Sequence, residues 1–213
     1  MHEGVWEKGP GRRMEISRWL FNPFYYVAGA KALVIGLLAL LPTGILGFLG
    51  GTRFDGILDF HLGLPPLSIW GHITENLLSW LLLGMLLFLA GKIVSKSRPR
   101  LIDVFGTQAL ARFPYLLLSL VALMLGANRF THALLEGHAL WNQFSADMAA
   151  FLFMVCFGLV MLVWMVLLMY RAFALSCNVS GAVGVTVFVV TLVAGEIISK
   201  ILIYHLFPIV MVA

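Results

Sequence analysis

The amino-acid sequence predicts an all-α protein, a polytopic integral membrane helical bundle with about five transmembrane helices. Hydrophobic residues make up 61% of the 213 residues and charged residues only 11%, whereas a soluble domain carries about 25% charged residues. So many apolar side chains do not fit inside one soluble core of this size, and lipid is their natural solvent. We therefore divide the chain into an N-terminal cytoplasmic tail, residues 1–20, and a five-helix transmembrane domain, residues 21–213.

The first two predicted spans have clear starts. The first runs from about Phe24 to Leu49 and follows Asn22 and Pro23, a pair that is typical of a helix start. Pro42 is expected to kink this helix. The second span runs from about Ser68 to Val94.

The remaining spans differ in how clearly the sequence marks them. The third centres on Phe113 to Ala127, which is too short to cross ~30 Å of hydrocarbon unless Val104 to Ala111 contributes. The fourth, Met148 to Tyr170, contains no charged residue. The fifth runs from about Gly181 to Leu206.

Basic residues are unevenly distributed over the connections. If the N-terminus is in the cytoplasm, ten Lys and Arg residues lie on the cytoplasmic side, and only Arg53 and Arg129 lie outside. Because cytoplasmic loops are enriched in Lys and Arg, we expect the N-terminus inside and the C-terminus outside. Omitting the third span changes neither total, so this count does not decide the number of spans.

The connection after the second span is strongly basic. We expect residues 93–112 to lie partly along the inner leaflet as an interfacial helix, with Leu101, Ile102, Val104 and Phe105 dipping into the acyl chains. Anionic lipid headgroups are then the expected contacts of four cations, Lys92, Lys96, Arg98 and Arg100.

Ionisable residues interrupt the fifth span and the start of the second. Glu196 and Lys200 share one helix face, His205 follows about one turn later, and His72 and Glu75 share a face of the second span. Because charges inside a membrane are costly, these five residues predict a polar site in the outer part of the bilayer, such as a proton relay, ion site or ligand contact. The plainer interpretation is that Glu196 and Lys200 only neutralise each other. We expect Lys200 to be the main partner of Glu196, with a partner on the second helix or a protonated carboxyl as alternatives.

Histidines gather in segments that are predicted to lie outside. His132, Glu136 and His138 share one polar connection, and imidazole with carboxylate suits zinc. A similar group, Asp55, Asp59 and His61, occurs between the first two spans. Neither spacing matches a specific zinc motif, so solvated loop residues are the alternative, and we expect no cofactor.

Catalytic motifs are missing from the sequence, which contains no GxSxG, P-loop, GxGxxG or CxxC pattern. We therefore expect a protein that is not an enzyme. Small residues predict close helix contacts instead: Gly47 and Gly51 form a GxxxG pattern, and Gly181 and Gly184 open the fifth span.

Four pieces of the chain occur in a familiar order. They are NPF at 22–24, a basic connection after the second span, GTQALARFP at 106–114, and the turn RAFALSCNVSG at 171–181. This order resembles the Yip1 domain family of five-span membrane proteins, over roughly residues 18–205, and in particular its short bacterial members. The resemblance implies a non-enzymatic factor of the inner (cytoplasmic) membrane that works beside other membrane proteins, possible transporters among them.

Three functions are compatible with these observations. The first is a scaffold or accessory subunit, the second a small ion- or proton-coupled transporter or channel, and the third an outer-face metal-binding protein. The expected partners are the lipid bilayer, with anionic headgroups on the cytoplasmic side, and other membrane proteins, including a second copy of this chain. Nucleic acid is not expected. Convergence of His72, Glu75, Glu196 and Lys200 on a cavity would favour the transporter.

Overall fold

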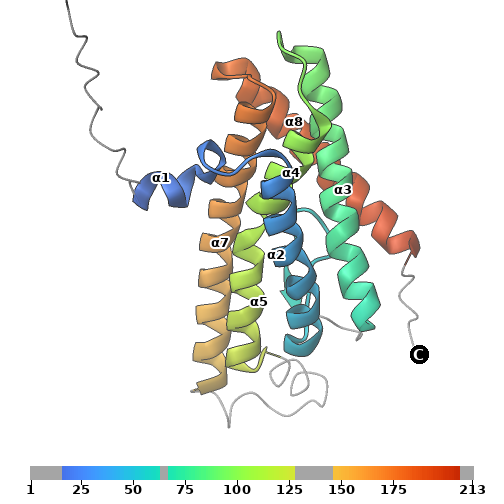
Figure 1. Cartoon of the computed structure of the whole chain (residues 1–213). Helices are drawn as coiled ribbons and strands as arrows, with labels where there is room; N and C mark the ends of the chain where they lie inside the picture. The colour runs from blue at the N-terminus through green and yellow to red at the C-terminus, as the bar shows by residue number, and fades with distance from the viewer. Residues whose placement is uncertain (1–15, 63–66, 128–145, 207–213) are drawn as a thin grey trace, which may run out of the picture.

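The computed structural model of the chain describes residues 16–62, 67–127 and 146–206. Within these residues, five helical segments are long and apolar enough to cross a membrane (Figure 1). They are α2 (Gly29–Gly50), α3 (Ile69–Val94), α4 (Leu101–Ala111) continued by α5 (Phe113–Leu125), α7 (Ala146–Ser176) and α8 (Gly181–Leu206). The all-α fold class is confirmed, and the length and composition of these helices make the chain a multi-pass membrane protein.

Local signals set most helix ends. The Ser68 hydroxyl accepts a hydrogen bond from the Gly71 N–H at 3.2 Å and caps α3, which begins one residue later than predicted. The α8 helix has the predicted bounds. The first span begins at Gly29 because residues 23–25 form a separate 3-10 turn, η1 (Pro23–Tyr25). The fourth span extends six residues beyond Tyr170, to Ser176.

The third span is built from two helices that meet at Arg112. Pro114 has no N–H to donate to the carbonyl four residues earlier, so the helical ladder is interrupted at this point. Val104 and Phe105 are buried in the bundle core, 0% and 8% exposed. The predicted interfacial helix is therefore wrong for Val104 and Phe105, because α4 is the first half of a segment long enough to span, while Leu101 and Ile102 are 51% and 42% exposed. Arg112, which the charge count placed in a cytoplasmic connection, lies inside that span.

Small residues bring α4 against α2. A Cβ atom added to Gly36 would lie 2.5 Å from the Cβ of Ala109, and one added to Gly106 would lie 2.5 Å from the carbonyl oxygen of Gly29. Side chains at Gly36 and Gly106 would therefore force the two backbones apart. This contact holds the third span in the centre of the bundle, where α4 also packs against α3 and α7.

The predicted GxxxG pair serves a different purpose. Gly51 ends α2 in the left-handed region, with φ of 67°. A Cβ atom at Gly47 would lie 3.0 Å from the Thr52 carbonyl oxygen, so Gly47 leaves room for the returning chain. The pair lets the chain turn back into the bundle rather than joining two helices.

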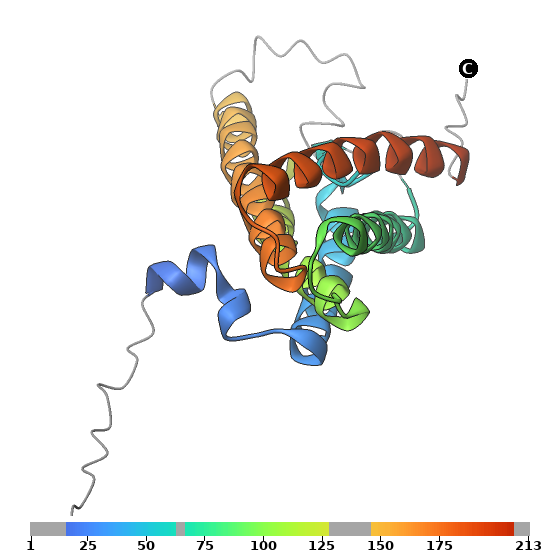
Figure 2. The ribbon, with the colours of Figure 1, turned by 90° about the horizontal axis from the view of Figure 1, so that it is seen from above.

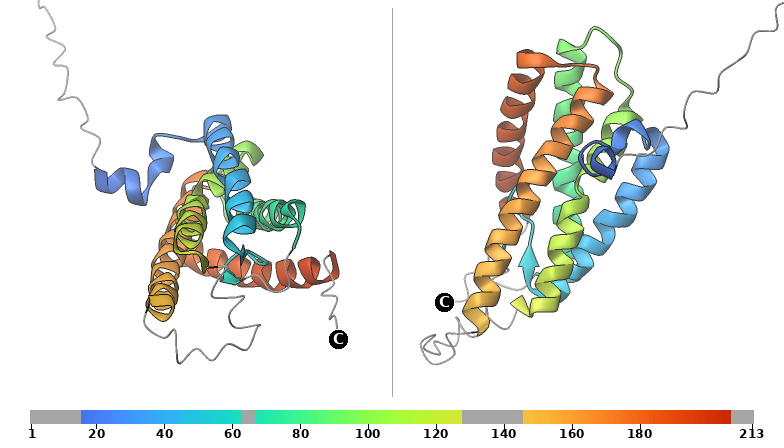
Figure 3. Two further views of the ribbon diagram at one scale, coloured as in Figure 1. Left: turned by 90° about the horizontal axis from the view of Figure 1, so that it is seen from below. Right: turned by 90° about the vertical axis from the view of Figure 1, so that its left-hand side faces the viewer.

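The segment between α2 and α3, here called the connection (residues 51–62), lies within the bundle rather than beyond its end (Figure 3). It forms a two-stranded antiparallel ladder, β1 (Thr52–Arg53) with β2 (His61–Leu62). Phe54 and Ile57, between the strands, are both 0% exposed. Burial of these two side chains explains why a segment that reads as a polar loop is held inside the protein.

Two helices depart from the common direction of the bundle. The short helix α1 (Ile16–Phe21) lies across it, and the Trp164 indole N–H donates to the Leu20 carbonyl at 2.9 Å (Figure 1). The boundary predicted at residue 20 therefore falls inside α1. Seen from above, α8 crosses the other spans at a wide angle (Figure 2). Its outward face is exposed and apolar.

Candidate charged site around the connection

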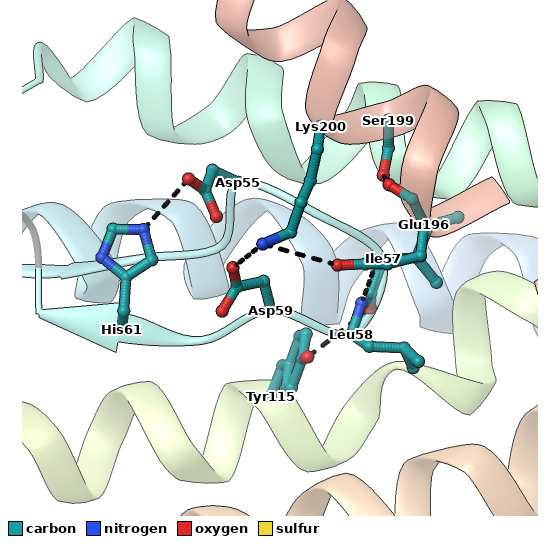
Figure 4. Close-up of polar contacts among 9 residues, drawn as sticks. All are labelled: Asp55, Ile57, Leu58, Asp59, His61, Tyr115, Glu196, Ser199 and Lys200. Atoms are coloured by element: carbon teal, nitrogen blue, oxygen red, sulfur yellow. Dashed lines mark hydrogen bonds and ion pairs between the residues drawn. The ribbon is translucent and has the colours of Figure 1, made fainter. Parts of the chain in front are cut away.

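Charged and polar side chains from separate segments of the chain meet around the connection, and Figure 4 shows those of the connection, α5 and α8. The α2–α3 end of the bundle, where α2 ends, α3 begins and α8 ends, contains them all. The connection contributes Arg53, Asp55, Asp59 and His61, α3 contributes His72 and Glu75, and α8 contributes Glu196 and Lys200. Residues that are far apart in the sequence therefore form one site.

Arg53 and Glu75 form a buried ion pair on the α3 side of the connection. The Arg53 side chain is 7% exposed and the Glu75 side chain 0%. Arg53 lies in the connection between α2 and α3, as the sequence indicates, but the connection packs inside the bundle and buries its side chain. His72 is also buried, and its ring nitrogen Nδ1 lies 3.0 Å from the Ser68 carbonyl oxygen.

On the opposite side of the connection, Lys200 pairs with Asp59. Its Nζ is 4.0 Å from Glu196 Oε1, at the outer limit of an ion pair. The expectation that Lys200 is the main partner of Glu196 is therefore corrected. Asp59 is brought within reach by the connection, and a carboxylate that approaches the ammonium directly outcompetes the i, i+4 neighbour.

The side chain of Glu196 binds the backbone of the connection. The Leu58 N–H donates to Glu196 Oε2 at 2.8 Å. A Cβ atom at Gly56 would lie 2.6 Å from Glu196 Oε1, so a larger residue at this position would displace the carboxylate. From the other side, the Tyr115 hydroxyl donates to the Ile57 carbonyl at 3.5 Å. One carboxylate from α8 and one phenol from α5 therefore clamp the connection from two sides.

Asp55, Asp59 and His61 could hold a metal ion. One ligand atom from each lies within 4.8 Å of the others, and His61 Nε2 is 3.0 Å from Asp55 Oδ2. Burial alone would raise the pKa of Asp55, but the hydrogen bond and charge of His61, with the charges of Lys200 and Arg53, lower it below its ordinary value. Because Lys200 already neutralises Asp59, a divalent ion would have to compete with the ammonium group for that ligand.

Arg112 lies deeper, at the break between α4 and α5. It is 2% exposed, and neither terminal nitrogen has a hydrogen-bond partner in the part of the chain that the structure describes. Its charge interacts with Tyr115 and Glu196. One turn away, Gln108 donates to the Met169 carbonyl at 3.0 Å, while its Oε1 lacks a partner. The guanidinium thus extends the charged site into the interior of the third span.

Two cavities flank the connection. One, of about 420 Å³, lies between the connection and α8 and is lined by Arg53, Asp55, Lys200, Ile201, Ile203, Tyr204 and His205. The other, of about 470 Å³, lies towards α5 and α7 and is largely apolar, with Asp59, His61 and Tyr115 as its polar lining. The connection separates a charged space from an apolar one.

The five residues predicted to form an intramembrane polar cluster gather at this end, but not as one group. Glu75 pairs with Arg53 and Lys200 with Asp59, so the connection stands between the two halves. His205 is exposed and shares the charged cavity with Lys200. The predicted metal ligands His132, Glu136 and His138 lie outside the described residues.

At the opposite end of the bundle, the four cations proposed to meet lipid headgroups are exposed. The Lys92 ammonium lies 4.9 Å from the centre of the Phe88 ring, and Arg100 pairs with Asp103 at 2.8 Å. Lys96 and Arg98, the other two cations of this group, are exposed as well.

Sequence reasoning missed the parts played by Arg53, Asp59 and Arg112. For Arg112 a signal was present, because Pro114 follows two residues later and Val104 to Ala111 was needed to complete the third span. For Arg53 and Asp59 no local signal existed, since their partners are distant in the sequence.

Comparison of the chain with models of protein families, with curated proteins and with solved structures finds no match. The function is therefore argued from the site itself.

Proposed function

We propose that the protein is a non-enzymatic membrane protein that moves protons or small ions through the charged site, as a small ion- or proton-coupled transporter or channel. One observation carries this proposal: ionisable side chains of the connection and of α8 border a charged cavity, and Glu75 of α3 and Tyr115 of α5 contact the same connection. Ionisable groups are costly inside a membrane and mark ion and proton pathways more often than they serve packing.

The groups form a graded series from the cavity to the interior. Lys200 and His205 line the cavity, Asp59 and Glu196 lie behind Lys200, and Arg112 lies deepest. Lys200 is 4.0 Å from Glu196 while it pairs with Asp59, so a small movement exchanges its partner. Neutralising either carboxylate by a proton would shift the ammonium towards the other, which is an elementary coupling step.

Proton flux into liposomes tests the proposal. The purified protein is reconstituted with an entrapped pH-sensitive dye, and flux is followed after a pH jump. Glu196→Gln should lower the flux, because it removes a titratable group from the series. Asp103→Asn is the matched control, since it makes the same kind of change in a carboxylate at the opposite end of the bundle. Flux equal to that of empty liposomes for the unaltered protein would contradict proton transport.

A second candidate is the scaffold or accessory subunit. In the most apolar window of α8 only 22% of residues are buried, against 50% in the third span, so α8 offers a broad apolar face to lipid or to another protein. The resemblance to the Yip1 domain family supports this candidate and stays a proposal itself. Co-purification from native membranes, read by mass spectrometry, should then recover a specific partner. Val190→Trp places a bulky side chain on the exposed face of α8, and loss of the partner from this variant would assign the contact to α8.

On the charge rule, we propose that the α2–α3 end faces outward from the cytoplasmic membrane. Labelling of single cysteines placed at Lys96 and at Asp55 should then occur from opposite sides. Labelling of both positions from one side would overturn this orientation.

A further inference from the structure

The cavity between the connection and α8 carries charges of both signs. Arg53 and Lys200 supply cationic groups to its wall, Asp55 supplies a carboxylate, and Tyr204 and His205 complete the polar lining. A pocket of about 420 Å³ is large enough for a small polar molecule or a lipid headgroup.

The two cations retain donors that their carboxylate partners do not use. Guanidinium offers five N–H groups and ammonium three. Arg53 lines the cavity and contacts Glu75 through one terminal nitrogen. The Lys200 side chain is 49% exposed although it pairs with Asp59. Both cations can therefore hold an anionic group such as a phosphate while keeping their present partners.

The opposite charge is equally available. Asp55 lines the cavity, and its side chain is 28% exposed although one oxygen pairs with His61. Tyr204 is 62% exposed, and its ring offers a face on which an ammonium group can rest. An ammonium group thus has both a carboxylate and an aromatic ring within the same cavity.

The balance of charges decides between ligand classes. The cavity itself is lined by two cations, Arg53 and Lys200, and by one carboxylate, Asp55. A ligand that is only anionic would engage the two cations but would bring a like charge beside Asp55. A zwitterion adds no net charge and satisfies both kinds of lining group.

The position of the cavity indicates the source of the ligand. It lies beside the last turns of α8, where Ile201 and Tyr204 are 55% and 62% exposed. The end of a spanning helix, with an exposed tyrosine, is the depth at which lipid headgroups lie.

We propose that this cavity binds the zwitterionic headgroup of a phospholipid, with its phosphate at Arg53 and Lys200 and its ammonium at Asp55 and Tyr204. A phosphoethanolamine headgroup has this chemistry. The site requires no transport, so binding would stand even if the reconstituted protein moved no protons.

Thermal stability of the delipidated protein in detergent tests the proposal. Dihexanoyl phosphatidylethanolamine should raise the melting temperature with a saturable dependence on concentration. Asp55→Asn and Tyr204→Ala should each weaken this effect, raising the lipid concentration needed by about tenfold. Lys96→Gln, an exposed cation at the opposite end, is the control and should leave the concentration unchanged.

Two further ligands make the outcome decisive. Dihexanoyl phosphatidylglycerol, which lacks the ammonium group, should stabilise the protein far less, and equal stabilisation by both lipids would overturn the proposal. Free phosphoethanolamine should act only at much higher concentration, because it lacks the acyl chains that hold the headgroup at the membrane surface. If it acts at the same concentration as the lipid, the zwitterion is retained and its assignment to a lipid is refuted.

Discussion

The buried pair of Arg53 and Glu75 offers the sharpest test of the charged site. Glu75→Gln would leave the Arg53 side chain, 7% exposed, without its salt-bridge partner, since among the described residues Glu75 is the carboxylate that pairs with it directly. Removing one partner of a buried pair costs about 3–5 kcal/mol, because the remaining charge is uncompensated. We therefore expect Glu75→Gln to lower the free energy of unfolding by roughly this amount.

The double change separates a true pair from two independent losses. Arg53→Met removes the stranded charge and keeps much of the side-chain volume, so the double variant should recover most of the stability lost by Glu75→Gln. Unfolding by sodium dodecyl sulfate in mixed micelles, followed by tryptophan fluorescence, measures all four proteins. Additive losses in the double variant would refute the pairing and with it the inward placement of the connection.

Three other expectations follow from the same structure. In a second double-mutant cycle, Lys200→Met should couple strongly with Asp59→Asn and only weakly with Glu196→Gln, because the ammonium lies against Asp59 and 4.0 Å from Glu196; equal couplings would contradict this. Gly36→Leu should destabilise the protein or prevent folding, measured as the yield of monodisperse protein, since its side chain would collide with the α4 backbone; normal yield would argue against the α2–α4 contact. Burial raises the pKa of the Cys177 thiol to about 11, from 9.0, so this thiol stays protonated and stabilising below pH 9.0, and the stabilisation is lost as pH rises through 11. Maleimide at pH 8 should accordingly modify Cys177 only after unfolding. The exposed Cys156 of α7 is the internal control and should react in the folded protein.

The number and bounds of the spans follow from local properties of the sequence. Hydropathy along about 20 residues decides whether a helix can cross a bilayer, and this depends on no distant partner. Likewise Ser68, which caps α3, acts on a backbone N–H three residues away. The third span was harder, because its two halves are separated by Arg112, which reads as a loop residue when its neighbours in space are unknown.

The partners of the charged residues were decided by the tertiary structure. Lys200 was predicted to choose Glu196, which is four residues away, but Asp59, 141 residues away, lies closer. This choice depends on the connection turning back into the bundle, which in turn depends on burial of Phe54 and Ile57. Helix periodicity states which residues share a face, but Coulomb attraction falls with distance in space, and only the packed chain determines which opposite charges are near.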